Sequence, residues 1–174
     1  LEELTLPSGS WLECMAGLGH LIRGFNLART GGASEVRSDV RWTAVEQHAP
    51  CEEELRELTD DVHIGDARVV LADFRAAGRR FEVGVTNPAF SLAFPVTLAL
   101  LEICDWVVVL QRTPWLGDEE QRLAYFAKNI PDEYRIGRVP FDRGGSDNVT
   151  VVIAQFRAAA NPTPELWTNQ AGHV

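Results

Sequence analysis

The sequence is short of positive charge and of long apolar runs. Its 25 acidic residues outnumber 16 basic ones, which gives a formal net charge of −9. A chain with this balance repels a phosphate backbone at long range, so we expect no nucleic-acid partner. No stretch approaches the roughly 18 consecutive apolar residues that a membrane span needs, and the first residues lack the pattern of a signal peptide. We therefore expect a cytoplasmic protein without membrane association.

Cysteine is also scarce, with three widely spaced residues, Cys14, Cys51 and Cys104. An odd number without CxxC or Cys/His ligand spacing argues against a disulfide framework and against a zinc site, and it favours a reducing compartment. Cys14 and Cys104 lie among apolar residues and are interpreted as core residues. Cys51 follows Pro50 and is expected to be more exposed.

The common catalytic motifs are missing as well. The four histidines are scattered singly and no HExxH occurs, which argues against a zinc hydrolase. Ser146 stands outside a GxSxG pattern, so no serine hydrolase is indicated. Neither a Walker phosphate loop nor GxGxxG is present, which argues against nucleotide binding of those kinds. Carboxylate chemistry stays open, because pairing in space is not visible in a sequence.

What is present suits one folded domain. The chain has 174 residues, of which 45% are hydrophobic and 24% charged, and a chain of this size can bury a core without disulfides or metals. We expect residues 1–160 to form a single domain. Prolines and polar residues predict that residues 161–174 form a loosely ordered tail.

Apolar spacing predicts an α+β fold, in which a mixed or mainly antiparallel sheet of about five or six strands packs against three or four helices. The predicted helices cover 11–28, a short segment opened by Pro50, a buried segment opened by Pro95, and a segment from Asp118 to before Pro131. The predicted strands cover 36–45, 106–110, 134–139 and 148–156, with 67–74 and 81–85 as an antiparallel hairpin around Gly78.

One stretch resembles a known family. The run Gly144-Gly145-Ser146-Asp147-Asn148-Val149-Thr150-Val151-Val152 resembles the closing motif of metal-dependent type 2C protein phosphatases, and residues 65–71 and 105–110 are weaker echoes in the same order. The resemblance implies that Asp147 binds a catalytic metal and that the valines form a core strand. The Glu-Asp and Asp-Gly metal motifs of that family are absent from this sequence. The resemblance therefore implies a shortened, metal-free relative, and the alternative is a simple turn at Asp147 or Asn148.

Two functional hypotheses follow. The preferred one is a noncatalytic binding or regulatory domain that docks a protein partner and needs no cofactor. Its candidate partner surface is Trp115 with the acidic residues Asp118 and Glu119, because aromatic anchors carry much interface energy.

The alternative hypothesis is a divergent phosphatase-like or other hydrolase that acts on a phosphate- or carboxylate-bearing ligand, with Mn or Mg as its metal. Its candidate ligand-binding residues are Arg112, Arg143, Asp147 and Asn148. A separate group of arginines, Arg75, Arg79 and Arg80, is interpreted as solvated surface in preference to a site for a small anion.

Overall fold

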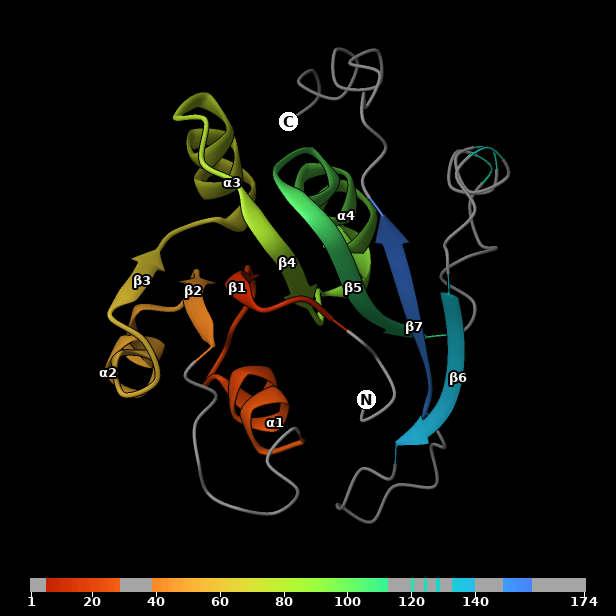
Figure 1. Cartoon of the computed structure of the whole chain (residues 1–174), viewed down its shortest axis with the longest axis horizontal. Coiled ribbons are helices and arrows are strands. Elements are labelled where there is room, and N and C mark those ends of the chain that lie inside the picture. The colour runs from red at the N-terminus through yellow and green to blue at the C-terminus, as the bar shows by residue number, and fades with distance from the viewer. Residues whose placement is uncertain are drawn as a thin grey trace.

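A computed structural model describes residues 6–28, 39–112, 133–139 and 149–157, together with Glu120, Ala124 and Lys128; beyond Gln111 it describes the two last strands by their backbone. One seven-stranded sheet runs through these residues in the order β3-β2-β1-β4-β5-β7-β6 (Figure 1). β1 pairs in parallel with β2 and β4, β2 with β3, and β4 with β5. β7 then runs antiparallel to both β5 and β6.

The chain alternates between strands and helices up to β5. The strands are β1 (Gly9–Glu13), β2 (Val40–Glu46), β3 (Asp61–Ile64), β4 (Phe81–Thr86), β5 (Cys104–Arg112), β6 (Glu133–Val139) and β7 (Val149–Arg157). The helices are α1 (His20–Ala28), the short 3-10 helix η1 (Ala49–Cys51), α2 (Glu52–Arg56), α3 (Ala67–Ala76) and α4 (Phe90–Ile103).

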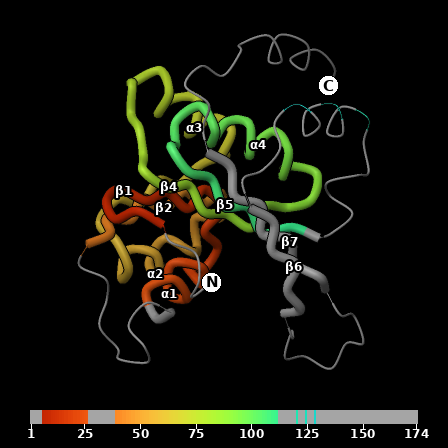
Figure 2. Tube along the Cα trace, turned by 45° about the vertical axis from the view of Figure 1, so that its right-hand side comes forward, coloured from red at the N-terminus to blue at the C-terminus, as the bar shows by residue number. Residues whose placement is uncertain are grey.

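The sheet lies between two layers of helices (Figure 2). α3 and α4 cover one face, where Leu12 of β1 packs in a cluster with Phe74 of α3 and Leu100 of α4. α1 and α2 cover the other face, where Trp11 packs with Ile22 and Leu55. Successive strand residues point to opposite faces, so both faces of a central strand are buried. The fold is therefore a layered α/β fold.

The predicted α+β class with a mixed or mainly antiparallel sheet is wrong, because β1 to β5 pair in parallel and alternate with helices. The segment 67–76 shows why the prediction failed. Its run of apolar and β-branched residues predicted a strand, but it forms α3, in which Ala67, Leu71 and Phe74 are buried along one side. The Asp66 side chain accepts a hydrogen bond from the Arg68 amide at 2.9 Å and caps this helix. The predicted hairpin is thus a helical crossover, and β4 lies parallel to its neighbours.

The predicted helix over 11–28 is wrong in its first half. Trp11 and Leu12 belong to β1 and are buried on opposite faces of the sheet. Gly17 and Gly19 follow with φ of 54° and 75°, values that L side chains rarely adopt, and the helix begins only at His20. The buried helix predicted to begin at Pro95 begins at Phe90 and contains Pro95. β3 was not predicted.

Several other predictions are confirmed. The apolar run 106–110 lies in β5, between β4 and β7, and β6 and β7 match the predicted strands over 134–139 and 148–156. The helix after Pro50 forms, and Cys14 and Cys104 are buried. Of the helix predicted from Asp118, the structure describes Glu120, Ala124 and Lys128, which are helical. The predicted tail lies outside the described residues. None of the described helices combines the length and apolarity needed to cross a membrane.

The closeness of β4 to its neighbours gives a test of the fold. A Cβ on Gly84 would lie 2.9 Å from Sγ of Cys104 and 3.2 Å from Cδ2 of Leu100. We expect Gly84→Ala to lower the free energy of unfolding by about 1–3 kcal/mol through overpacking, as measured by urea denaturation. The control is Gly24→Ala in α1, where a Cβ meets nothing within 4 Å and should stabilise the helix by up to about 1 kcal/mol. Equal stability of the two variants would contradict the packing described.

Candidate functional site

The strand order itself marks a place where a ligand can bind. From β1 the chain passes through α1 to β2 on one side, whereas α3 carries it from β3 to β4 on the other side of β1. Chain connections therefore leave β1 and β4 in opposite directions. In open parallel sheets, ligands bind outside the carboxyl ends of the strands at such a switch point. The carboxyl edge of β1–β4 is thus the first place to look for a site.

The loop that follows β1 is shaped by two glycines. Gly17 and Gly19 both have positive φ, and a Cβ on Gly19 would collide with Leu58. The loop is fixed to the next strand, because the Gly17 amide donates to Oε2 of Glu46 at 2.7 Å. Oε1 of Glu46, at the end of β2, also accepts from the His48 amide at 2.8 Å. One carboxylate therefore holds two backbone segments at the edge of the sheet.

Glu13, the last residue of β1, is a fully buried acid. Its Oε1 accepts from the Met15 amide at 3.2 Å, but within the described part of the chain Oε2 has no hydrogen bond of ordinary geometry. The same holds for Oγ1 of Thr86 at the end of β4, which is also fully buried. Unsatisfied buried polar groups are costly and are concentrated at functional sites.

The environment of Glu13 also changes its acidity. Burial raises the pKa of Glu13 to about 8, although the Met15 amide and the Thr86 hydroxyl lower the pKa and the Glu46 charge raises it further. The group is therefore protonated in the free protein at neutral pH. A cation placed beside it would favour the carboxylate, so the end of β1 is suited to a positively charged ligand.

A third acid and several apolar side chains complete the edge. Asp66 follows β3 and forms an ion pair with Arg68 at 2.6 Å, and the hydrogen bonds from Arg68 lower the pKa of Asp66. The exposed large apolar residues of the described ranges are all near this edge: Leu18 after β1, Ile64 at the end of β3, Val69 in the first turn of α3 and Phe90 in the first turn of α4. Carboxylates close to exposed apolar side chains suit an organic ligand that carries positive charge.

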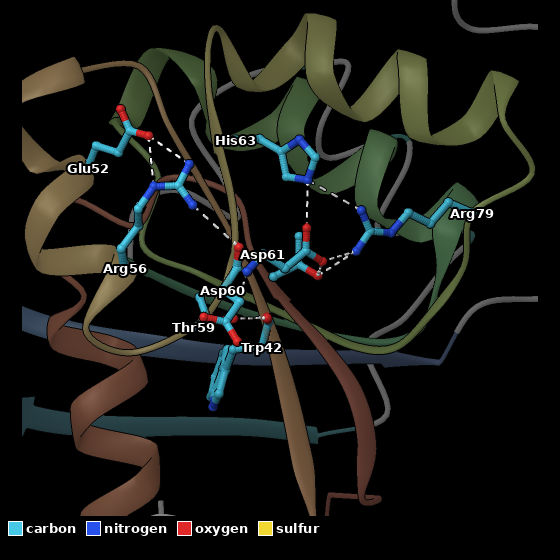
Figure 3. A network of polar contacts seen from close by, with 9 residues as sticks. Trp42, Glu52, Arg56, Thr59, Asp60, Asp61, His63 and Arg79 are labelled. Carbon is cyan, nitrogen blue, oxygen red and sulfur yellow. Dashed lines mark hydrogen bonds and ion pairs between the residues drawn. The ribbon is translucent and has the colours of Figure 1, made fainter.

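The arginine group at the amino ends of the strands does not form a second candidate site, because its charges are already paired. Arg75 pairs with Glu102 at 2.9 Å, Arg80 with Asp105 at 3.0 Å, and Arg79 with Asp61. Figure 3 shows His63 and Arg79 both directed toward Asp61, with the His63 ring 2.8 Å from its carboxylate. Burial raises the pKa of Asp61, but hydrogen bonds from Arg79, Thr43 and His63 outweigh it and lower the pKa overall. These charges satisfy one another, as expected of paired surface groups.

The structure places few of the residues predicted to form a site. Arg112 is the last residue of β5 and pairs with Val151 of β7, and its side chain lies outside what is described. The other predicted residues lie outside the described residues, so their roles stay predictions; they are Arg143, Asp147, Asn148, Trp115, Asp118 and Glu119.

Sequence reasoning missed the residues that the structure brings together, which are Glu13, Gly17, Gly19, Glu46, Asp66 and Thr86. A signal was present, because an acid at the end of a strand is followed four residues later by Gly-x-Gly, directly before a helix. The glycines were interpreted as weak points of one long helix. Without the third glycine of GxGxxG, no motif contradicted that interpretation.

Comparison with known proteins gives a consistent result at the level of fold. No protein-family model and no curated protein matches the chain. A proposed RNA methyltransferase from Pyrococcus horikoshii has a TM-score of 0.60 at 20% identity, over 91% of this chain and 76% of that protein. A proposed methyltransferase solved with S-adenosylhomocysteine has a TM-score of 0.58 at 10% identity, over 87% and 45%. A proposed class I S-adenosylmethionine-dependent methyltransferase from Listeria monocytogenes has a TM-score of 0.54 at 14% identity, over 94% and 58%.

These likenesses correct several expectations. The chain spans less than two thirds of the last two proteins, and the layered α/β fold is what it shares with all three, each of which is described as a proposed methyltransferase. The resemblance to type 2C phosphatases is therefore wrong, and so are the phosphatase-like alternative and the noncatalytic domain inferred from missing motifs. The expectation that no cofactor is involved is corrected as well, because one neighbour was solved with S-adenosylhomocysteine.

The buried acid predicts an unusual dependence of stability on pH. The pKa of Glu13 is about 8 in the folded protein against an ordinary value of 4.5, so the unfolded chain loses the proton first. Folding is therefore disfavoured progressively between pH 4.5 and about 8, by about 1.4 kcal/mol per pH unit at most. We expect Glu13→Gln to be increasingly stabilising from pH 5 to pH 8 in urea denaturation.

The matched control is Asp73→Asn, which removes one charge from an exposed position on α3. Its effect should be small and nearly constant over the same pH range. If the difference between Glu13→Gln and wild type did not change with pH, Glu13 would not be held in its neutral form.

Proposed function

We propose that this chain is an S-adenosylmethionine-dependent methyltransferase that binds its cofactor at the carboxyl edge of β1–β4. The observation that carries the proposal is the fully buried Glu13, placed next to Thr86 and the Gly17–Gly19 loop at the switch point of the sheet; within the described residues its Oε2 has no hydrogen bond of ordinary geometry. The fold of the neighbours supports it, since they are described as methyltransferases that use this cofactor.

The residues at the edge fit the chemistry of S-adenosylmethionine. This cofactor carries a sulfonium and an ammonium, and a carboxylate at Glu13 would oppose that positive charge. Glu46 uses each oxygen for one backbone amide, and a carboxylate can accept further hydrogen bonds from ribose hydroxyls. The exposed side chains of Ile64 and Val69 provide apolar surface for a flat adenine ring. The positive φ values of Gly17 and Gly19 let the backbone pass close to the ligand.

Methyl transfer needs an acceptor held on the other side of the methyl group. When bound, S-adenosylmethionine supplies an electrophilic methyl on sulfur. The turn after β4 is adjacent to Thr86 and presents Asn87 and Phe90 to solvent. The Asn87 carboxamide can donate to and accept from an acceptor, and the Phe90 ring can stack on a flat one. The chain's own residues would thus orient the acceptor and exclude water from the transfer.

The charge of the chain bears on the acceptor. A net charge of −9, with Arg68 at the edge already paired to Asp66, favours a neutral or cationic acceptor over a polyanion. The few, widely spaced cysteines favour a cytoplasmic enzyme. One neighbour is described as a proposed RNA methyltransferase, so RNA belongs among the acceptors to be tested.

Calorimetric titration with S-adenosylmethionine and S-adenosylhomocysteine tests the proposal directly. We expect saturable binding of both to the wild-type protein, and at least about tenfold weaker binding to Glu46→Gln, because a lost charged hydrogen bond costs about 1.5–3 kcal/mol. Asp73→Asn is the control for loss of one negative charge and should bind like wild type. Absence of binding heat with both ligands would contradict the proposal.

A further inference from the structure

Gln111 is a buried polar residue close to the proposed site. It lies near the carboxyl end of β5 and is 7% exposed. Val107 and Val109 of the same strand pack in the core under α4, and alternation places Gln111 on that same face of the sheet. Gln111 thus lies next to the turn that connects β4 to α4.

β5 extends further than β4 toward the carboxyl edge of the sheet. The last pair between β4 and β5 is Thr86 with Val109, after which β4 ends and the chain turns into α4. β5 continues along β7 through the pair Gln111 with Val152. The turn at Asn87 and Pro88 therefore lies beside the extension of β5 without a strand ladder to hold it.

A side-chain hydrogen bond takes the place of that ladder. Nε2 of Gln111 donates to the carbonyl oxygen of Pro88 at 2.6 Å, and both residues are buried. Pro88 has no amide proton of its own, and the residue at the start of α4, Ala89, has no side chain that can cap the helix. Loss of the donor would leave a buried carbonyl without its partner, which is costly.

We infer that Gln111 is a positioning residue, which holds the Asn87–Phe90 turn against β5 so that the turn forms the acceptor side of the cofactor site. The inference rests on the proposed function for the identity of the site. The hydrogen bond of Gln111 goes to the Pro88 carbonyl of the turn, not to the carboxylates of Glu13 and Glu46. Gln111 binds the Pro88 carbonyl and thereby fixes the position of the exposed residues Asn87 and Phe90 on either side of it.

Hydrogen exchange with and without S-adenosylmethionine tests the inference. Gln111→Met keeps the length of the side chain and removes the donor. We expect the amides of Asn87 and of residues 89–92 to exchange about tenfold faster or more, while residues 97–103 of α4 keep their protection. The cofactor should protect residues 14–20 in both proteins, and the turn in wild type alone.

Two further variants separate positioning from general stability. In Gln111→Glu a protonated carboxyl can donate to the Pro88 carbonyl and an ionised one cannot, so protection of the turn should recover as the pH falls; Gln111→Met should show no such recovery. Thr97→Val removes another buried bond to a backbone carbonyl, from Thr97 Oγ1 to Ala93 at 2.7 Å within α4. It should leave exchange at the turn unchanged.

The outcomes distinguish this inference from the proposed function. Faster exchange spread evenly over β4 and α4 in Gln111→Met, or no change at the turn, would overturn the positioning role. Cofactor protection of the turn that is equal in wild type and Gln111→Met would also overturn it. If S-adenosylmethionine protected no residue of any variant, the proposed function would fail. Hydrogen exchange at the turn in the ligand-free proteins would still show whether Gln111 stabilises the turn.

Discussion

The parallel pairing of β1 with β4 is the constraint on which the rest of this structure depends. The pairs Trp11 with Val83 and Leu12 with Gly84 bring together two strands that are separated in the chain by two other strands. Because β1 and β4 are neighbours, the connection from β1 to β2 and the connection from β4 to β5 lead to opposite sides of the pair. The carboxyl ends of the parallel strands lie at one edge of the sheet. Glu13, Glu46 and Thr86 are brought together there because each of them ends its strand.

The two ends of the strands differ in how well their polar groups are satisfied. At the amino end, Asp61 accepts from Thr43, is paired with His63 and Arg79, and the Arg79 guanidinium lies 4.5 Å from the centre of the Phe74 ring. At the carboxyl end, Glu13 is buried next to Thr86, and among the described residues its Oε2 has no hydrogen bond of ordinary geometry; the loop beside it uses two glycines of positive φ. The first arrangement stabilises the fold. The second is unfavourable for the free protein, and the cofactor that we propose would supply a positive charge there.

How much of this could be predicted from the sequence depended on whether the signal was local. β5 and β7 contain continuous apolar runs, and α2 follows Pro50 closely and has three acids in its first turn, so each was predictable from its own residues. The segment 67–76 was not, because Val69 and Val70 favour a strand and the cap at Asp66 decides otherwise. The direction of β4 depends on which strands lie beside it, and local periodicity does not contain that information.

The site was harder to predict than the fold. Gly17 and Gly19 indicate a ligand loop only when the residues before them form a strand, and Trp11 and Leu12 fit the spacing of an amphipathic helix equally well. Glu46 and Asp66 are ordinary surface acids until the parallel register places them at one edge with Glu13. Gln111 gives no signal in the sequence, since its role depends on β5 extending past the end of β4.

The central claim is that the carboxyl edge of β1–β4 binds S-adenosylmethionine. The most direct measurement is a nuclear magnetic resonance titration that follows the backbone amides of the described residues as the cofactor is added. The account predicts saturable shifts at residues 14–19, 46–48, 64–66 and 86–87, with little change around Thr43, Asp61 and Arg79. Shifts concentrated at that amino-end cluster, or none at the carboxyl edge at millimolar cofactor, would contradict it.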